Sequence, residues 1–211
     1  MLDAHGDTAQ NNGRAGHAGR HKTLLTAFVG VLRSVWGQLV EQEPTDHFSY
    51  SDYQPDVAAA GYSRILKSGK RLCGDLKLLD SLSSNPEDVG HVGAHVGFGN
   101  TQPDIEAQVR RDYELALTKG CEVQCLLFET FGGFSAAVVR LIGKAAAHRG
   151  NKLSHSQHLD EASWSTRTWT SLQCQRLSVA LHTACAWEIQ EELSRAAGPP
   201  TPCLGDFVAG A

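Results

Sequence analysis

A short apolar run near the middle of the chain limits the possible folds more than any other feature. Residues 123–129 read VQCLLFE and are bounded on both sides by glycine-containing turn signals. A run this short and this apolar is typical of a β-strand that is buried on both faces. Because helices usually cover such a strand on both sides, the chain is expected to have an α/β fold.

Helical periodicity is found on both sides of this strand. Apolar residues recur on one stripe of residues 22–40, ending with Leu39, and Gly37 is expected to weaken the last turn. A second helix is expected over residues 105–119, and a third from a cap at Ser135 to Ala147. The order helix, strand pair, helix, buried strand, helix predicts a mixed central sheet flanked by helices.

The composition is that of a folded globular chain. Of the 211 residues, 41% are hydrophobic and 20% are charged. No run of about 18 apolar residues occurs, so no membrane partner is expected. Changes in composition predict four parts, namely a flexible leader (1–20), the α/β domain (21–150), a C-terminal helical extension (151–198) and a loose tail (199–211).

The cysteine spacing and the charge distribution bear on the location of the protein and on what it could bind. The six cysteines lack paired CxxC spacing, which favours reduced thiols and an intracellular location, nuclear or cytoplasmic. The net charge is −4, but residues 8–40 and 130–159 contain basic residues and no acidic ones. Local positive regions of this kind can attract a phosphate backbone, although ordinary solvated surface charge explains them equally well.

The segment 55–77 carries the residues of greatest chemical interest. Asp56 stands before a turn at residues 67–70, and Asp75 and Lys77 follow in a short apolar run that predicts a strand. Side chains alternate along a strand, so Asp75 and Lys77 are expected on the same face. The turn would place Asp56 beside that strand, so that two carboxylates and one ammonium group meet.

Two readings of this segment remain open from the residues alone. Paired carboxylates are suitable ligands for Mg²⁺, and a nearby lysine can position a water molecule or stabilise developing negative charge. The alternative is a turn aspartate next to an ordinary surface ion pair on a half-exposed hairpin.

Pro55, Asp56, Asp75 and Lys77 resemble the PD-(D/E)XK signature of the restriction-endonuclease-like nucleases. Three further pieces accompany it, namely Arg20-His21, Glu43-Pro44 and the run FETFGG at 128–133. Together they are similar to the endonuclease-like segment beside the reverse transcriptases of non-LTR retroelements and in retroelement-derived proteins of algae and protists. The resemblance covers roughly residues 20–150.

The resemblance implies a restriction-endonuclease-like core and a Mg²⁺- or Mn²⁺-dependent DNA endonuclease. Asp56 and Asp75 would bind the metal, and Lys77 would be the water-orienting base or the charge stabiliser. Glu43 would be an additional metal-binding acid or, equally well, a surface glutamate. Tyr113 lies where related domains carry a tyrosine, and core packing is the favoured interpretation of it.

The resemblance also implies partners. DNA would be contacted by basic residues, for which the candidates are Lys67, Lys70, Arg71 and Arg110. A reverse transcriptase, or a second copy bound through the C-terminal helix, is a further candidate partner. The alternative function is a catalytically inactive nuclease-fold domain that binds DNA or protein, in which the acids are separated or ion-paired to surface lysines.

Overall fold

A four-stranded mixed β-sheet forms the centre of the protein. The computed structural model describes residues 17–44, 54–60, 70–79, 101–130, 132–160 and 166–197. The strands lie in the order β1-β2-β3-β4. Their bounds are Val40–Gln42, Val57–Ala59, Leu72–Leu79 and Glu122–Glu129, for β1 to β4 respectively.

The strand directions confirm the expected mixed sheet. β1 pairs antiparallel with β2, and β2 pairs antiparallel with β3. β3 and β4 run parallel over their full length, with Asp75 opposite Cys125. A helical connection joins β3 to β4, as a crossover between parallel strands requires.

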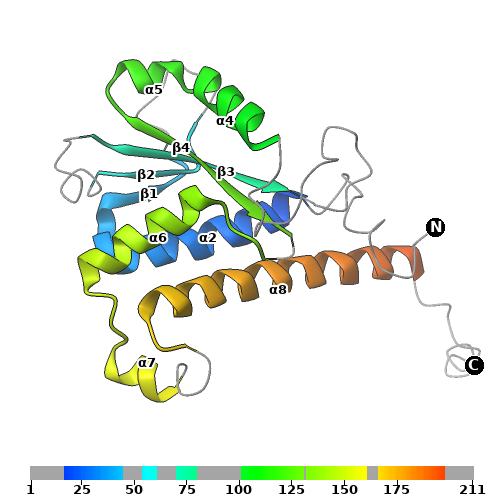
Figure 1. The fold of residues 1–211 in the computed structure, drawn as a ribbon. Coiled ribbons are helices and arrows are strands. Elements are labelled where there is room, and N and C mark those ends of the chain that lie inside the picture. The colour runs from blue at the N-terminus through cyan, green and yellow to red at the C-terminus, as the bar shows by residue number, and fades with distance from the viewer. Residues whose placement is uncertain are drawn as a thin grey trace, which may run out of the picture.

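Helices cover both faces of the sheet (Figure 1). α4 and α5 lie on one face, and α2 and α6 lie on the other. α8 packs against α2 and α6, and its C-terminal part projects beyond the sheet. The helix bounds are α2 His17–Trp36, α4 Thr101–Asp112, α5 Glu114–Thr118, α6 Ala136–Arg149, α7 His155–Asp160 and α8 Trp169–Ala197.

Side-chain alternation on β3 divides the core into two clusters. Leu72, Leu76 and Leu78 face the larger cluster, which is shared with α2, α6 and α8. Cys73 faces the smaller cluster beneath α4 and α5, which includes Val109, Tyr113 and Leu127. α8 contributes Trp169, Leu177 and Leu181 to the larger cluster, so it is packed on the same core as the sheet.

The predicted helix boundaries were partly correct. Ser135 caps α6, since its hydroxyl oxygen accepts a hydrogen bond from Val138 N, as expected. Gly37, with a φ of 60°, begins a three-residue 3₁₀ turn (Gly37–Leu39) after α2, and this turn leaves Leu39 exposed rather than on the buried stripe. The expected continuous helix over residues 105–119 is broken at Tyr113 into α4 and α5.

None of the helices that the structure describes is both long enough and apolar enough to cross a membrane.

Candidate active site

The register of β2 and β3 brings Asp56 and Asp75 together. Val57 lies opposite Gly74 in an antiparallel pair, so Asp56, the residue before β2, comes level with Asp75. β3 continues beyond the end of β2. At this point the side-chain carboxylate of Asp56, instead of a main-chain carbonyl oxygen of β2, accepts a hydrogen bond from β3. Leu76 N donates to Asp56 Oδ2 over 2.6 Å.

Lys77 completes the arrangement expected from the sequence. Its Nζ lies 2.9 Å from Asp75 Oδ2, on the same face of β3. Burial alone would lower the pKa of Lys77, but the hydrogen bond and charge of Asp75 and the charge of Asp56 raise it above its usual range. Lys77 is therefore a cation at neutral pH and in this state cannot accept a proton. Its chemical role is to position groups and to stabilise negative charge.

Tyr113 holds Asp75 from the opposite side, beneath the break between α4 and α5. The Tyr113 hydroxyl lies 2.9 Å from Asp75 Oδ1 and 2.7 Å from the carbonyl oxygen of Gln54. Burial and the nearby charges of Asp75 and Asp56 raise the pKa of Tyr113, so the hydroxyl stays protonated. Tyr113 is buried, as the core interpretation expected, but it also orients the carboxylate of Asp75.

His21 on α2 is the functional candidate that sequence reasoning did not single out. Its Nε2 lies 3.1 Å from Leu76 O and 3.4 Å from Asp56 Oδ2. Because a carbonyl oxygen can only accept, Nε2 must carry a hydrogen. The hydrogen bond with Asp56 raises the pKa of His21 against the opposing effect of burial. In the sequence, His21 is marked only by its place beside Arg20 near the start of the helix. That place does not indicate a contact with Leu76, which lies 55 positions farther along the chain.

Glu43 contacts this cluster with its main chain and not with its side chain. Glu43 N donates to Asp56 O over 2.8 Å, and Glu43 has a positive φ of 46°. Its side chain is exposed. Glu43 is thus close to the site, while its carboxylate is on the solvent side of the strand end.

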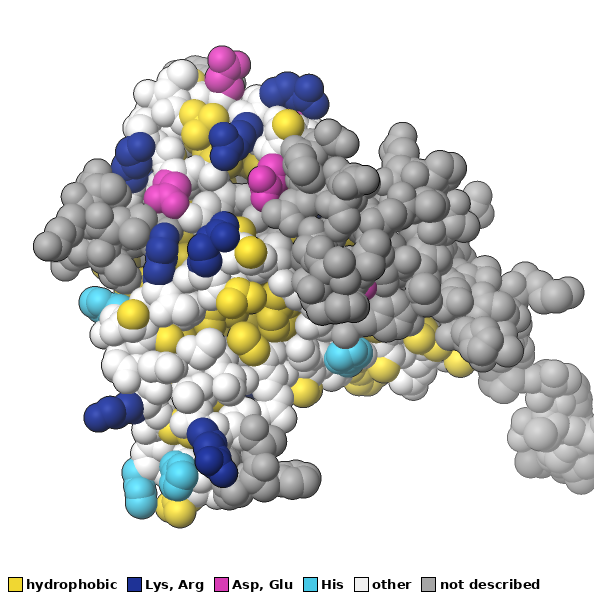
Figure 2. Space-filling view, viewed as in Figure 1, with side chains coloured by type: hydrophobic (Ala, Val, Ile, Leu, Met, Phe, Trp, Pro, Cys, Tyr) yellow, Lys and Arg dark blue, Asp and Glu magenta, His cyan; other side chains and the backbone are white. Residues whose placement is uncertain are grey.

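The candidate DNA-binding residues are dispersed. Arg71 precedes β3 at the end away from Lys77, and its Nη2 is 2.9 Å from Glu41 Oε1. Lys70 is exposed beside it. Arg110 is exposed on α4 near the outer edge of β4. Lys67 lies outside the described residues. On the face seen in Figure 2, basic side chains are interspersed with acidic ones.

The two aspartates fit a Mg²⁺ ion in their donor chemistry. Tyr113 uses one oxygen of Asp75 and Lys77 the other, and each oxygen has a further lone pair. Among the described residues, Asp56 Oδ1 has no hydrogen-bond partner. Mg²⁺ commonly takes one or two carboxylates and completes its shell with water and phosphate oxygens.

Over the described ranges, no group of three or more His, Cys, Asp or Glu side chains is arranged to hold a metal ion. Among the described residues, a metal at this position would therefore depend on the carboxylates of Asp56 and Asp75. These two residues would have to be complemented by oxygen atoms of the substrate and of water.

Comparisons with protein-family models, with curated proteins and with solved structures found no significant match to this chain.

Proposed function

We propose that this protein is a Mg²⁺-dependent endonuclease that cleaves or nicks DNA. The observation that carries the proposal is that Lys77 Nζ lies 2.9 Å from Asp75 Oδ2, while the carboxylate of Asp56 accepts a hydrogen bond from Leu76 N, between these two residues. The two acids come from two neighbouring positions of one sheet, one before β2 and the other within β3. Two acids and a lysine in one place suit the hydrolysis of a phosphodiester.

The arrangement of the fold supports the same proposal. A leading helix, a strand pair bearing the acids, a helix, a buried strand and a helix follow one another as α2, β2–β3, α4–α5, β4 and α6. This is the order of the restriction-endonuclease-like core that the sequence resembles. Membership of the PD-(D/E)XK superfamily and derivation from a retroelement are part of the proposal.

Each residue has a distinct role in the proposed reaction. Asp56 and Asp75 would hold the ion, which when bound would lower the pKa of a bound water and offset charge on a phosphodiester oxygen. Lys77, as a cation, stabilises the negative charge that develops on the phosphate and orients the attacking water. Tyr113 fixes the carboxylate of Asp75 by donating a hydrogen bond to Oδ1. His21 Nε2 bonds to Leu76 O and lies 3.4 Å from Asp56 Oδ2, so that a protonated imidazole holds this carboxylate by its charge.

The proposal extends to the partners and the location of the protein. DNA is the proposed substrate, and a reverse transcriptase or a second copy bound through α8 is a proposed partner. An intracellular location, nuclear or cytoplasmic, would be consistent with the reduced thiols of the described cysteines.

A supercoiled-plasmid nicking assay tests the function. The wild type is incubated with Mg²⁺, Mn²⁺ or EDTA beside Asp75→Ala and Lys77→Ala. We expect nicking that requires metal and is lost in both variants. Absence of nicking by folded wild type with either metal would contradict the proposal. Nicking that persists in Asp75→Ala would show that the site lies elsewhere or that another nuclease is present.

One observation favours a second function, a nuclease-fold domain that binds DNA or protein without cutting. Asp75 is ion-paired to the half-exposed Lys77, and Asp56 is bonded to Leu76 N and close to His21. Such bonds neutralise acids that a metal would otherwise require. In this case Mg²⁺ would not raise the melting temperature of the wild type, and Asp75→Asn would not change DNA binding.

A further inference from the structure

The described residues cover only half of the outer edge of β4. β4 is the last strand of the described sheet, with β3 on its inner side. Residues 133–135 pair with the C-terminal half of its outer edge. Glu129 N donates to Gly133 O over 2.9 Å, and Ser135 N donates to Leu127 O over 3.0 Å. The pairing is antiparallel, with Phe128 opposite Phe134.

The N-terminal half of the same edge presents open main-chain groups. Glu122 N donates to Arg71 O, toward β3, whereas the main-chain groups of Leu127 and Glu129 point outward. Because main-chain groups alternate along a strand, those of Val123 and Cys125 also point outward. Among the described residues none pairs with them on that side. Unpaired edges of this kind are templates for another strand.

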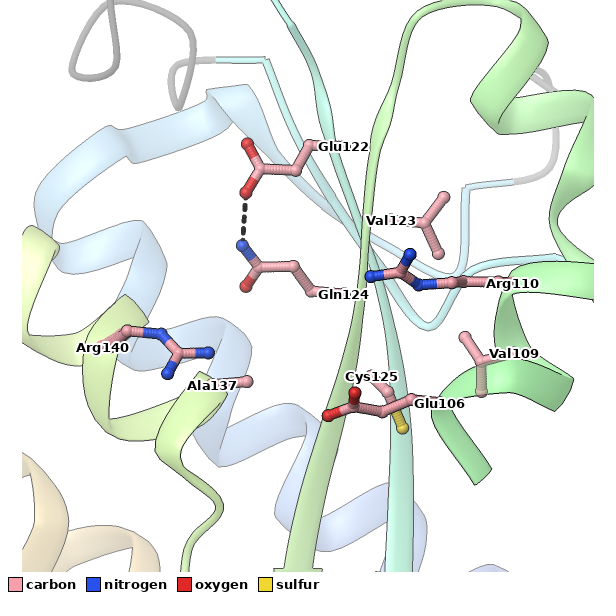
Figure 3. Close-up of a pocket in the computed structure, with 9 residues that line it drawn as sticks. All are labelled: Glu106, Val109, Arg110, Glu122, Val123, Gln124, Cys125, Ala137 and Arg140. Atoms are coloured by element: carbon pink, nitrogen blue, oxygen red, sulfur yellow. Dashed lines mark hydrogen bonds between the residues drawn. The ribbon is translucent and has the colours of Figure 1, made fainter. Parts of the chain in front are cut away.

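This half of the edge is the floor of a groove between α4 and α6. The groove has a volume of about 260 Å³. Figure 3 shows Arg110 reaching over β4 from α4, and Arg140 directed toward the same space from α6. Both arginines are exposed. Neither forms an ion pair with a described residue, so each guanidinium group is available for a carboxylate.

We propose that this groove binds an acidic, extended peptide segment of a partner protein as an additional antiparallel strand of the sheet. The edge offers donors and acceptors in alternation, so it matches a polypeptide main chain. A nucleic-acid backbone has phosphate acceptors only and would meet the outward carbonyl oxygens of Val123 and Cys125 unfavourably. Residues 133–135 already pair in the proposed manner one step farther along the same strand.

The charges of the groove specify the side chains of that peptide. Successive side chains of an added strand point to opposite faces of the sheet. Arg110 and Arg140 flank opposite faces, so acidic residues at two adjacent positions would reach one arginine each. Glu106 and Glu122 also line the groove, and Glu122 accepts a hydrogen bond from Gln124. These acids oppose a uniformly acidic ligand and restrict the favourable positions to those beside the arginines.

The test uses a capped, dye-labelled peptide of sequence Thr-Val-Glu-Asp-Val-Thr and the full chain. Binding is measured by fluorescence anisotropy, and the exchange of main-chain amides is followed by NMR. We expect slower exchange of the Val123 and Cys125 amides on binding. In Arg110→Glu/Arg140→Glu, affinity should fall by about tenfold or more. Arg111→Glu, a single charge reversal on the same helix outside the groove, should leave affinity within about twofold.

Two changes test the main-chain pairing itself. Val123→Pro removes an outward N–H group without removing a β3–β4 hydrogen bond, and should abolish binding. If this variant does not fold, the same peptide with N-methylated central amides takes its place, and it should not bind to the wild type. Equal binding of the N-methylated peptide, or unchanged exchange at Val123 and Cys125, would overturn the proposal. Perturbation of these amides by a duplex oligonucleotide but not by the peptide would assign the groove to DNA instead.

Discussion

The hydroxyl of Tyr113 donates a hydrogen bond to Asp75 Oδ1 over 2.9 Å, although the two residues are 38 positions apart. The same hydroxyl also bonds to Gln54 O, which precedes the Asp56 segment. One buried side chain thus connects the two stretches that carry the acids. Tyr113 occupies the break between α4 and α5, where its ring packs in the smaller core cluster.

Tyr113→Phe should therefore destabilise the protein while it preserves the packing of the ring. Removal of the hydroxyl takes away the one hydrogen that Asp75 Oδ1 and Gln54 O share, and the loss of this donor at the buried Asp75 carboxylate costs about 1–3 kcal/mol. The free energy of unfolding is measured by urea denaturation. Thr118→Ala is a suitable control, since Thr118 is exposed and its hydroxyl bonds only locally to Leu115 O. An equal effect of the two substitutions would contradict the role given to Tyr113.

The contact between His21 and Asp56 predicts a pH dependence of stability. The folded-state pKa of His21 is raised above its ordinary value of 6.5, so the folded state binds this proton more tightly than the unfolded state. The contribution is fully present below pH 6.5 and is lost as the pH rises through the raised value. The stability difference between wild type and His21→Gln should thus be larger at pH 5.5 than at pH 8.5.

Asp56→Asn provides the control for this pH dependence. It removes the carboxylate that is the largest cause of the raised His21 pKa and leaves the ring in place. The pH-dependent difference between this variant and its His21→Gln double variant should be much smaller. A difference that increases with pH instead would show that the effect of burial exceeds that of Asp56.

Gly74 illustrates how closely β3 is packed next to Asp75. An added Cβ would lie 2.7 Å from Leu126 Cδ1 and 2.7 Å from Val57 Cγ1. Gly74→Ala should destabilise the fold by about 1–3 kcal/mol, as overpacking does in cores, and should reduce nicking by displacing Asp75. Gly143→Ala in α6 meets nothing within 4 Å and should instead stabilise by up to about 1 kcal/mol. Thermal denaturation of both variants measures the contrast.

A buried ion pair joins α2 to α8. Arg20 Nε lies 2.5 Å from Glu188 Oε2, and both side chains are almost fully buried. Arg20→Met should lower the free energy of unfolding by about 3–5 kcal/mol, because it leaves the carboxylate of Glu188 buried without this ion-pair partner. The double variant Arg20→Met/Glu188→Met should recover a large part of that loss. The free energies of unfolding are measured by guanidinium denaturation. A double variant that is no more stable than Arg20→Met would show that the ion pair stabilises the protein more than apolar packing does at this position.

The sequence was informative where the structure depends on local alternation. A strand with Asp75 and Lys77 on one face follows from residue spacing, and both residues do face the same side. The continuous apolar run at 123–129 correctly indicated a strand, β4, which begins one residue earlier and is buried only from Cys125 onward. The capping of α6 by Ser135 likewise depends on neighbours in sequence.

The sequence was less informative where side chains meet across the fold. His21 reaches Leu76 and Asp56 only because α2 packs on the sheet. The hydroxyl of Tyr113 reaches Asp75 only because the helix breaks at that residue, a break that helical periodicity does not reveal. The half-open edge of β4 depends on the path of residues 133–135, which no pattern in the sequence specifies.

The measurement to make first is a titration of the wild type with Mn²⁺, monitored by the EPR signal of the free ion. Asp56→Asn, Asp75→Asn and the matched control Glu43→Gln are titrated in parallel. We predict one bound Mn²⁺ per chain in the wild type and in Glu43→Gln, and loss of that binding in both aspartate variants. Equal binding by all four proteins, or no binding by the folded wild type, would contradict a metal site built on Asp56 and Asp75.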